Sequence, residues 1–153
     1  MANQLETAFP GLLTRAIAWA ETKSAEAIRF GVALDPADIG LAEAVGVACP
    51  EKIRVQLVDL MPFPDDLALR DAAHQLGLLS SKTRGLTFGY AIFIRHGHRT
   101  QQLLSHECRH VNQYEVAGSI GAFLPLYLEQ ILTHGYAAAP FEIDARYHEQ
   151  HST

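Results

Sequence analysis

The segment from Thr100 to Ala117 contains neither proline nor glycine, and it follows a stretch rich in apolar and aromatic residues. Its apolar side chains recur at helical spacing, so the segment predicts one amphipathic helix. Thr100 is suited to cap the first turn of that helix. A helix at this place decides which side chains share a face, because residues four apart lie on the same side.

The predicted helix carries the sequence His106-Glu107-Cys108-Arg109-His110, which has the form H-E-x-x-H. His106 and His110 are four residues apart and can present two imidazole nitrogens to one metal ion. Glu107 lies beside them, where its carboxylate can take a proton from a water molecule. Cys108 points in another direction and is predicted to fill the core. Arg109 is predicted to face solvent.

A catalytic zinc ion needs a third protein ligand, with the fourth position left for water. Glu142 is the predicted third ligand. It follows His110 by one complete helix, predicted over residues 119–134, and a turn, so the chain has room to return to the metal. Pro140 suits the first turn of a last helix, and that helix would carry Glu142.

Three other residues remain candidates for the third ligand: His134, Asp144 and His148. Asp144 lies two positions from Glu142 and is expected to point elsewhere on the helix. His134 ends a predicted helix, where it can instead complement the helix dipole. Glu115 and Glu129 are predicted to lie on solvated faces.

The distribution of apolar residues predicts an α+β fold with a helical majority. Helices are predicted over residues 13–28, 35–46, 65–77, 100–117 and 119–134, and from Pro140 onward. Strands are predicted at 52–58 and 86–95. Two strands make a thin sheet, so one or two further short strands are expected in a small, mostly antiparallel sheet. The chain is predicted to form one domain over 1–153, with a helical part (1–48) and a core (50–153) that carries the motif.

Composition and charge exclude several classes of protein. The chain has 12 Lys+Arg against 17 Asp+Glu and no run of basic residues, which argues against a nucleic-acid partner. Its longest strongly apolar stretch, residues 86–94, is too short to span a bilayer as a helix. The N-terminal residues lack the basic region of a signal peptide. Cys49 and Cys108 cannot form a disulfide framework, so reduced thiols and a cytoplasmic location are expected. The oligomeric state is not readable from the sequence.

H-E-x-x-H followed by a glutamate on a later helix resembles the gluzincin metallopeptidases. More narrowly, the chain is similar to small bacterial proteins with segments of the type L-L-x-H-E-x-x-H-V-x-Q-Y, F-L-x-x-Y-L, H-G-Y and P-F-E. Those segments stand here at residues 103–114, 123–128, 134–136 and 140–142. The resemblance extends over residues 86–147. It implies a zincin-like domain with one Zn²⁺ per chain, held by His106, His110 and Glu142.

The resemblance also implies a function, the hydrolysis of peptide or amide bonds in a peptide or protein substrate. Glu107 would act as the general base. Tyr136, on the loop before the last helix, is the candidate hydrogen-bond donor to the developing oxyanion; the alternatives are Tyr114 and Arg146. The strand at 86–95 would form the rim of the cleft, with Gly89 and Tyr90 as the substrate-binding residues.

Two points of the sequence leave alternatives open. Many gluzincins place an aspartate four residues after the ligand glutamate to support a histidine, whereas this chain has Arg146 there. The supporting group is therefore expected elsewhere, at Asp144 or at a backbone carbonyl. The same donor set also suits iron, manganese or cobalt. The alternative functions are a non-hydrolytic zincin-like module with a structural or partner-binding role, which the presence of Glu107 disfavours, and hydrolysis of an ester or a cell-wall amide.

Overall fold

The computed structural model describes residues 2–151, so the outermost residues of the predicted domain, 1 and 152–153, lie outside the described part. The helices are α1 (Ala2–Ala8), α2 (Leu12–Phe30), α3 (Pro36–Ala44), α4 (Leu67–Gln75), α5 (Gln101–Ala117), α6 (Ile120–His134) and α7 (Pro140–Tyr147), with a short 3₁₀ turn, η1 (Pro50–Lys52). The strands are β1 (Val32–Ala33), β2 (Arg54–Val58), β3 (Gly85–Phe88) and β4 (Ala91–Arg95). The fold is α+β with a helical majority, as predicted.

The strands form one mixed sheet in the order β1-β2-β4-β3. The β1–β2 and β3–β4 pairs are antiparallel, whereas the central β2–β4 pair is parallel. A parallel pair needs a long crossover connection, and the segment that contains α4 provides it. The two-residue strand β1 is one of the short additional strands that the sequence implied without locating.

The segment at 86–95, predicted as a single strand, is instead a hairpin made of β3 and β4. Gly89 and Tyr90 form its two-residue turn, and Gly89 has a φ of +66°. A positive φ at the first position of such a turn favours glycine. The residues on both sides of the turn are buried. The sequence of the two strands and the turn is therefore one continuous apolar run, which resembles a single strand.

Side chains from opposite faces of the sheet enter two different parts of the core. Ile92 and Ile94 pack with Val55 and with α3 and α5, whereas Ala91 and Phe93 pack with α2 and α6. This alternation follows the two-residue period of a strand. Cys108 belongs to the first cluster and is fully buried, which confirms its predicted place in the core. Burial raises the pKa of its thiol to about 12.

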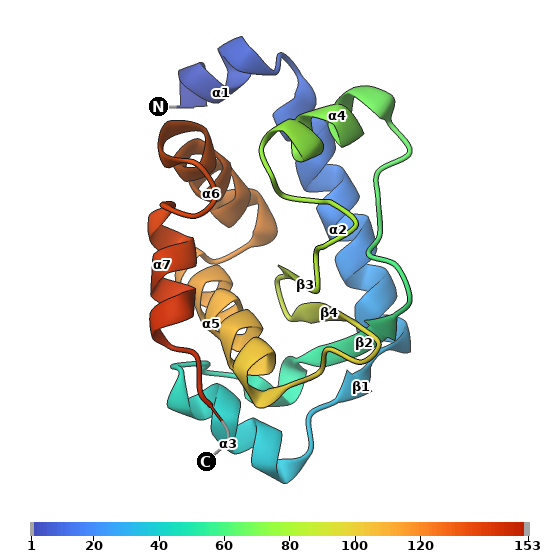
Figure 1. Cartoon of the computed structure of the whole chain (residues 1–153), viewed down its shortest axis with the longest axis vertical. Helices are drawn as coiled ribbons and strands as arrows, with labels where there is room; N and C mark the ends of the chain where they lie inside the picture. The colour runs from blue at the N-terminus through green and yellow to red at the C-terminus, as the bar shows by residue number, and fades with distance from the viewer. Residues whose placement is uncertain (1, 152–153) are drawn as a thin grey trace.

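The helix ends follow from local sequence signals. The side chains of Asp35, Asp66 and Thr100 accept hydrogen bonds from the first-turn N–H groups of α3, α4 and α5, at 2.9–3.1 Å. Each of these bonds satisfies a donor that the helix itself leaves unpaired. Helix α1 was not predicted. It packs on α6 and α2 at one end of the molecule (Figure 1).

Helix α5 lies between the sheet and α7, as Figure 1 shows, and α6 crosses beside it. The α5 residues that face α7 include the two motif histidines. Among residues 2–151 no single helix is long and apolar enough to cross a membrane; α5 and α6 satisfy the length and composition only as a pair bent by 115°.

Candidate metal centre

His106 and His110 on α5 meet Glu142 on α7 at one point between the two helices. One ligand atom from each residue lies within 4.8 Å of the other two. The Nε2 atom of His106 is 3.2 Å from Oε1 of Glu142, and Nε2 of His110 is 3.0 Å from Oε2. The structure thus brings together the three residues that the sequence predicted as ligands, because α6 and the following turn return the chain to α5.

These distances suit a small tetrahedral ion. With ligand bonds of about 2.0–2.1 Å, neighbouring ligand atoms of a tetrahedral zinc site are separated by about 3.3 Å. The separations between Glu142 and the two histidines are close to that value. The three side chains are also shielded from solvent, with exposed fractions of 12% for His106, 9% for His110 and 2% for Glu142. Two imidazoles and one carboxylate form a donor set that zinc prefers.

The electrostatics of the cluster strongly favour its charged forms. Burial lowers the pKa of His106, but its bond to Glu142 and the nearby carboxylates outweigh this and raise the pKa to about 9. The pKa of His110 is raised for the same reasons. Burial raises the pKa of Glu142, yet the hydrogen bonds from both histidines outweigh burial and lower it. Protons and a metal ion therefore compete for the same imidazole nitrogens.

Each histidine is oriented by a hydrogen bond on its other ring nitrogen. Nδ1 of His106 lies 2.9 Å from Oε2 of Glu149, which follows α7, and Nδ1 of His110 lies 2.8 Å from Oε1 of Gln113. Such contacts fix the ring so that Nε2 faces the metal position. Glu149 thus provides the support for His106 that was expected from Asp144 or a backbone carbonyl.

Asp144 supports the site indirectly. Its carboxylate accepts hydrogen bonds from Nε2 of Gln113 at 2.9 Å and from Nε of Arg109 at 2.8 Å. Asp144 therefore positions Gln113, which in turn orients His110. The expectation that Asp144 would contact a histidine ligand directly was wrong. Arg109 also donates to the carbonyl of Val45. Its side chain therefore faces inward, and the prediction that it faces solvent was wrong.

The carboxylate of Glu107 is positioned by the edge strand β3. Its Oε1 accepts a hydrogen bond of 2.8 Å from the hydroxyl of Thr87. A Cβ atom at Gly85 would lie 2.8 Å from Oε2 of Glu107, so this carboxylate occupies space that only glycine leaves open. Sequence reasoning missed both residues, because nothing local relates β3 to a helix 20 residues later.

Two tyrosines border Glu142. The hydroxyl of Tyr127 on α6 donates to Oε2 of Glu142 at 2.8 Å, a role that was not predicted although Tyr127 lies in the segment 123–128 of the resemblance. Tyr136 lies on the loop before α7. This residue is 41% exposed, yet desolvation of the hydroxyl at the site, followed by the charges of Glu142 and Glu107, raises the pKa of the hydroxyl. Tyr136 therefore stays protonated near neutral pH, close to both carboxylates.

The alternatives to Tyr136 are engaged elsewhere. The hydroxyl of Tyr114 donates to the backbone carbonyl of Thr87 at 3.1 Å. The guanidinium of Arg146 donates to the carbonyl of Ala137, so it braces the loop that carries Tyr136.

The structure does not bring Gly89 and Tyr90 to the metal centre. A Cβ atom at Gly89 would meet Ile120 at 3.6 Å, and the Tyr90 hydroxyl donates to Glu115 at 2.7 Å. The strand that borders Glu107 is β3, not the hairpin turn. The segment 86–95 is two strands instead of one; its first part, β3, borders Glu107, whereas the turn residues Gly89 and Tyr90 do not.

Glu115 and the rival ligand residues also have defined places. The Glu115 carboxylate accepts hydrogen bonds from the N–H groups of Ala48 and Cys49, at 2.8 and 2.9 Å. It is thus a clamp between α5 and the loop after α3, and the expectation of a solvated face was wrong. His134 is exposed at the end of α6, and Nδ1 of His148 contacts the carbonyl of Asp144.

No protein-family model matches the chain, and neither the curated proteins nor the solved structures provide a match. The function of the site has to be inferred from its geometry.

Proposed function

We propose that this protein is a zinc-dependent metallopeptidase of the gluzincin type, which hydrolyses peptide or amide bonds. The observation that carries the proposal is the convergence of His106, His110 and Glu142 at tetrahedral spacing, next to the separately positioned carboxylate of Glu107. One Zn²⁺ per chain would be held by the three residues. When bound, zinc lowers the pKa of a coordinated water towards ~7 and polarises a substrate carbonyl.

Glu107 is the general base in this proposal. The bond from Thr87 and the close approach of Gly85 hold its carboxylate beside the metal position. Glu107 takes the proton from the attacking water and then passes it to the departing amine. A purely structural metal site would have no use for a carboxylate held in this manner.

Tyr136 is the proposed donor to the oxyanion that develops on the substrate carbonyl. Its raised pKa keeps the phenol protonated, as a donor must be. Its loop is braced by Arg146. Tyr127 keeps a different role, because its hydroxyl is already bonded to the ligand Glu142.

The proposed substrates are peptides or proteins, and the proposed location is the cytoplasm. The two thiols, Cys49 and Cys108, are both free, which suits a reducing compartment.

The proposal is tested by replacing Glu107 with Gln. This variant is expected to keep close to one zinc ion per chain, by elemental analysis, and to lose hydrolysis of a fluorogenic peptide mixture that the wild type cleaves. His106→Ala is expected to lose the metal. Glu43→Gln makes the same change at an exposed glutamate on α3, and as the control it is expected to keep both zinc and activity.

Two results would overturn the proposal. A wild-type protein that takes up no zinc after reconstitution has no metal centre of this kind. A Glu107→Gln variant with full activity would remove Glu107 as the general base.

A further inference from the structure

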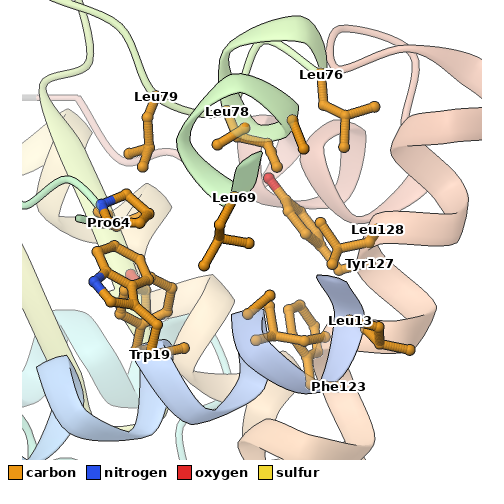
Figure 2. A pocket seen from close by; sticks show the side chains of 18 of the residues that line it. Leu13, Trp19, Pro64, Leu69, Leu76, Leu78, Leu79, Phe123, Tyr127 and Leu128 are labelled. Atoms are coloured by element: carbon orange, nitrogen blue, oxygen red, sulfur yellow. The ribbon is translucent and has the colours of Figure 1, made fainter. Parts of the chain in front are cut away.

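Two cavities of opposite character meet at the proposed active site. The apolar cavity lies between α2, α4 and α6 and has a volume of about 130 Å³. Its walls include Leu13, Trp19, Leu69, Leu76, Phe123 and Leu128 (Figure 2). The polar cavity, of about 410 Å³, is lined by residues of the 77–85 loop and of α5. Glu107, Tyr136 and Glu142 border both cavities.

Most of the apolar wall comes from α2, α4 and α6, which provide none of the three predicted metal ligands. In Figure 2 the side chain of Leu69 from α4 projects into the space between Trp19 on α2 and Tyr127 on α6. The charged residues that border the cavity are those of the metal centre: Glu107, His110 and Glu142. The walls therefore select an apolar group, and the reacting groups lie at one side of the cavity.

The volume of the cavity limits the size of that group. A cavity of about 150 Å³ lined by leucine, isoleucine and phenylalanine stays dry and binds benzene. A volume of about 130 Å³ therefore fits one phenyl ring or one branched aliphatic side chain. A long acyl chain or an indole exceeds it.

The edge of β3 limits how a peptide can bind. The N–H of Arg95 donates to the carbonyl of Arg84, and hydrogen-bonded and non-bonded pairs alternate along an antiparallel ladder. Gly85 and Thr87 therefore direct their backbone groups away from β4. The outward carbonyl of Thr87 is already occupied by the Tyr114 hydroxyl.

An added peptide strand bonds to every second residue of a sheet edge. On β3 those residues are Gly85 and Thr87, and only Gly85 keeps an outward carbonyl that no described residue bonds. The edge therefore offers both backbone groups only at Gly85, and at Thr87 it offers the N–H alone. Beyond Gly85, a long extended peptide would gain at most one further backbone hydrogen bond on this strand, from the N–H of Thr87.

We infer that the preferred substrate is a short peptide or amide with one ring-sized apolar group, which enters the apolar cavity while the backbone is anchored at Gly85. This inference rests on the proposed function. It assigns substrate selection to α2 and α4, and it places the reacting carbonyl where the two cavities meet.

The inference is tested by calorimetric binding to zinc-loaded Glu107→Gln protein. The probes are the N-acetyl amides of Phe-Ala, Ala-Phe and Ala-Ala, and a nonapeptide with the tighter Phe dipeptide at its centre. At least one Phe probe is expected to bind about tenfold or more tightly than Ala-Ala, because a filled apolar site discriminates by about 10- to 200-fold. The nonapeptide is expected to match its dipeptide within about threefold.

Variants of α4 test the cavity itself. Ala73 lines the cavity, whereas Ala68 on the same helix is exposed. When Ala73→Leu is added to the Glu107→Gln protein, most of the preference for the Phe probe is expected to be lost. Ala68→Leu in the same protein is expected to leave that preference unchanged. Leu69→Ala enlarges the cavity and is expected to shift the preference from a Phe probe to its Trp counterpart. Thermal melting of each variant confirms that it is folded.

Equal binding of the Phe and Ala probes would overturn the inference, and so would a nonapeptide that binds more than about tenfold tighter than its dipeptide. Failure of the proposed function looks different. In that case the wild type hydrolyses none of the probes, while the binding pattern of the zinc-loaded protein still follows the cavity.

Discussion

The two sides of the proposed active site are held together in different ways. On the side of α5 and α7, ligands and their supporting residues are joined by directed hydrogen bonds, such as those from His106 to Glu149 and from His110 to Gln113. On the side of α2 and α4, Leu69, Trp19 and their neighbours make apolar contacts with no preferred direction. The geometry of the first side depends on individual hydrogen-bonding atoms, whereas the shape of the second depends on the volume of its apolar side chains.

This difference predicts how each side responds to substitution. Removing one partner of a buried hydrogen bond leaves the other unsatisfied, which costs about 1–3 kcal/mol. An apolar wall tolerates exchanges that conserve its volume at a cost below about 1.5 kcal/mol. Substitutions near the ligands should therefore change metal affinity or chemistry, whereas those on α4 should change the preferred substrate.

The largest effect is expected for Glu142→Ala. It removes a ligand and also the carboxylate that both imidazoles face. Loss of a residue that only supports a ligand lowers metal affinity by up to about 100-fold. Loss of the ligand Glu142 should lower zinc affinity by more than that. Competition with a fluorescent chelator measures this, and Glu43→Ala, which removes an exposed carboxylate on α3, is the control. Stoichiometric, tightly held zinc in Glu142→Ala would place the third ligand elsewhere.

Gly85→Ala should separate chemistry from metal binding. The new Cβ would lie 2.8 Å from Oε2 of Glu107, and the flexible glutamate can move aside. Hydrolysis should therefore lose the general-base contribution of about 10²–10⁴-fold, while zinc content stays unchanged. Gly121→Ala is the control, because its Cβ would have no neighbour closer than 3.8 Å. Unchanged turnover in Gly85→Ala would mean that the position of Glu107 is not critical.

Glu149→Ala should weaken zinc binding by about 10- to 100-fold, because it removes the group that orients His106. Glu149→Gln keeps an oxygen that can accept the same hydrogen bond, so its loss should be smaller. The two affinities, measured at one pH, separate orientation of the ring from the charge of the carboxylate. If both variants bind zinc as the wild type does, the contact with Glu149 has no part in orienting the ligand.

The smallest effect is expected for Thr100→Ala, which removes the cap of the helix that carries the motif. Loss of such a cap costs about 1 kcal/mol in the free energy of unfolding. Denaturant unfolding measures this cost. Zinc content should not change, because the motif lies beyond the first turn. A loss of zinc together with stability would show that the start of α5 and the metal centre are coupled.

Local patterns predicted much of the side that carries the motif. The cap Thr100, the helical spacing of α5 and Pro140 in the first turn of α7 are all short-range signals, and the structure confirms these helices. Helix periodicity alone places His106 and His110 on one face. The convergence with Glu142 then needed only one further helix of suitable length.

The hairpin shows where local patterns were insufficient. Alternation between polar and apolar residues marks a strand with one face in solvent, but both faces of β4 are covered. The apolar run through Gly89 therefore had no polar residue to mark its turn. This error placed the expected substrate contacts at Gly89 and Tyr90, whereas the strand that borders Glu107 is β3, which carries Gly85 and Thr87.

The sequence by itself determined the helices from α2 onward and the identity of the donor atoms, because caps, periodicity and a four-residue spacing act within one or two turns of chain. Only the tertiary structure decided which groups orient those donors and which space lies beside them. Glu149 reaches His106 across 43 residues and Thr87 reaches Glu107 across 20, and the apolar cavity is shared by α2, α4 and α6. Contacts of this kind depend on how separate elements pack, and no local pattern encodes that packing.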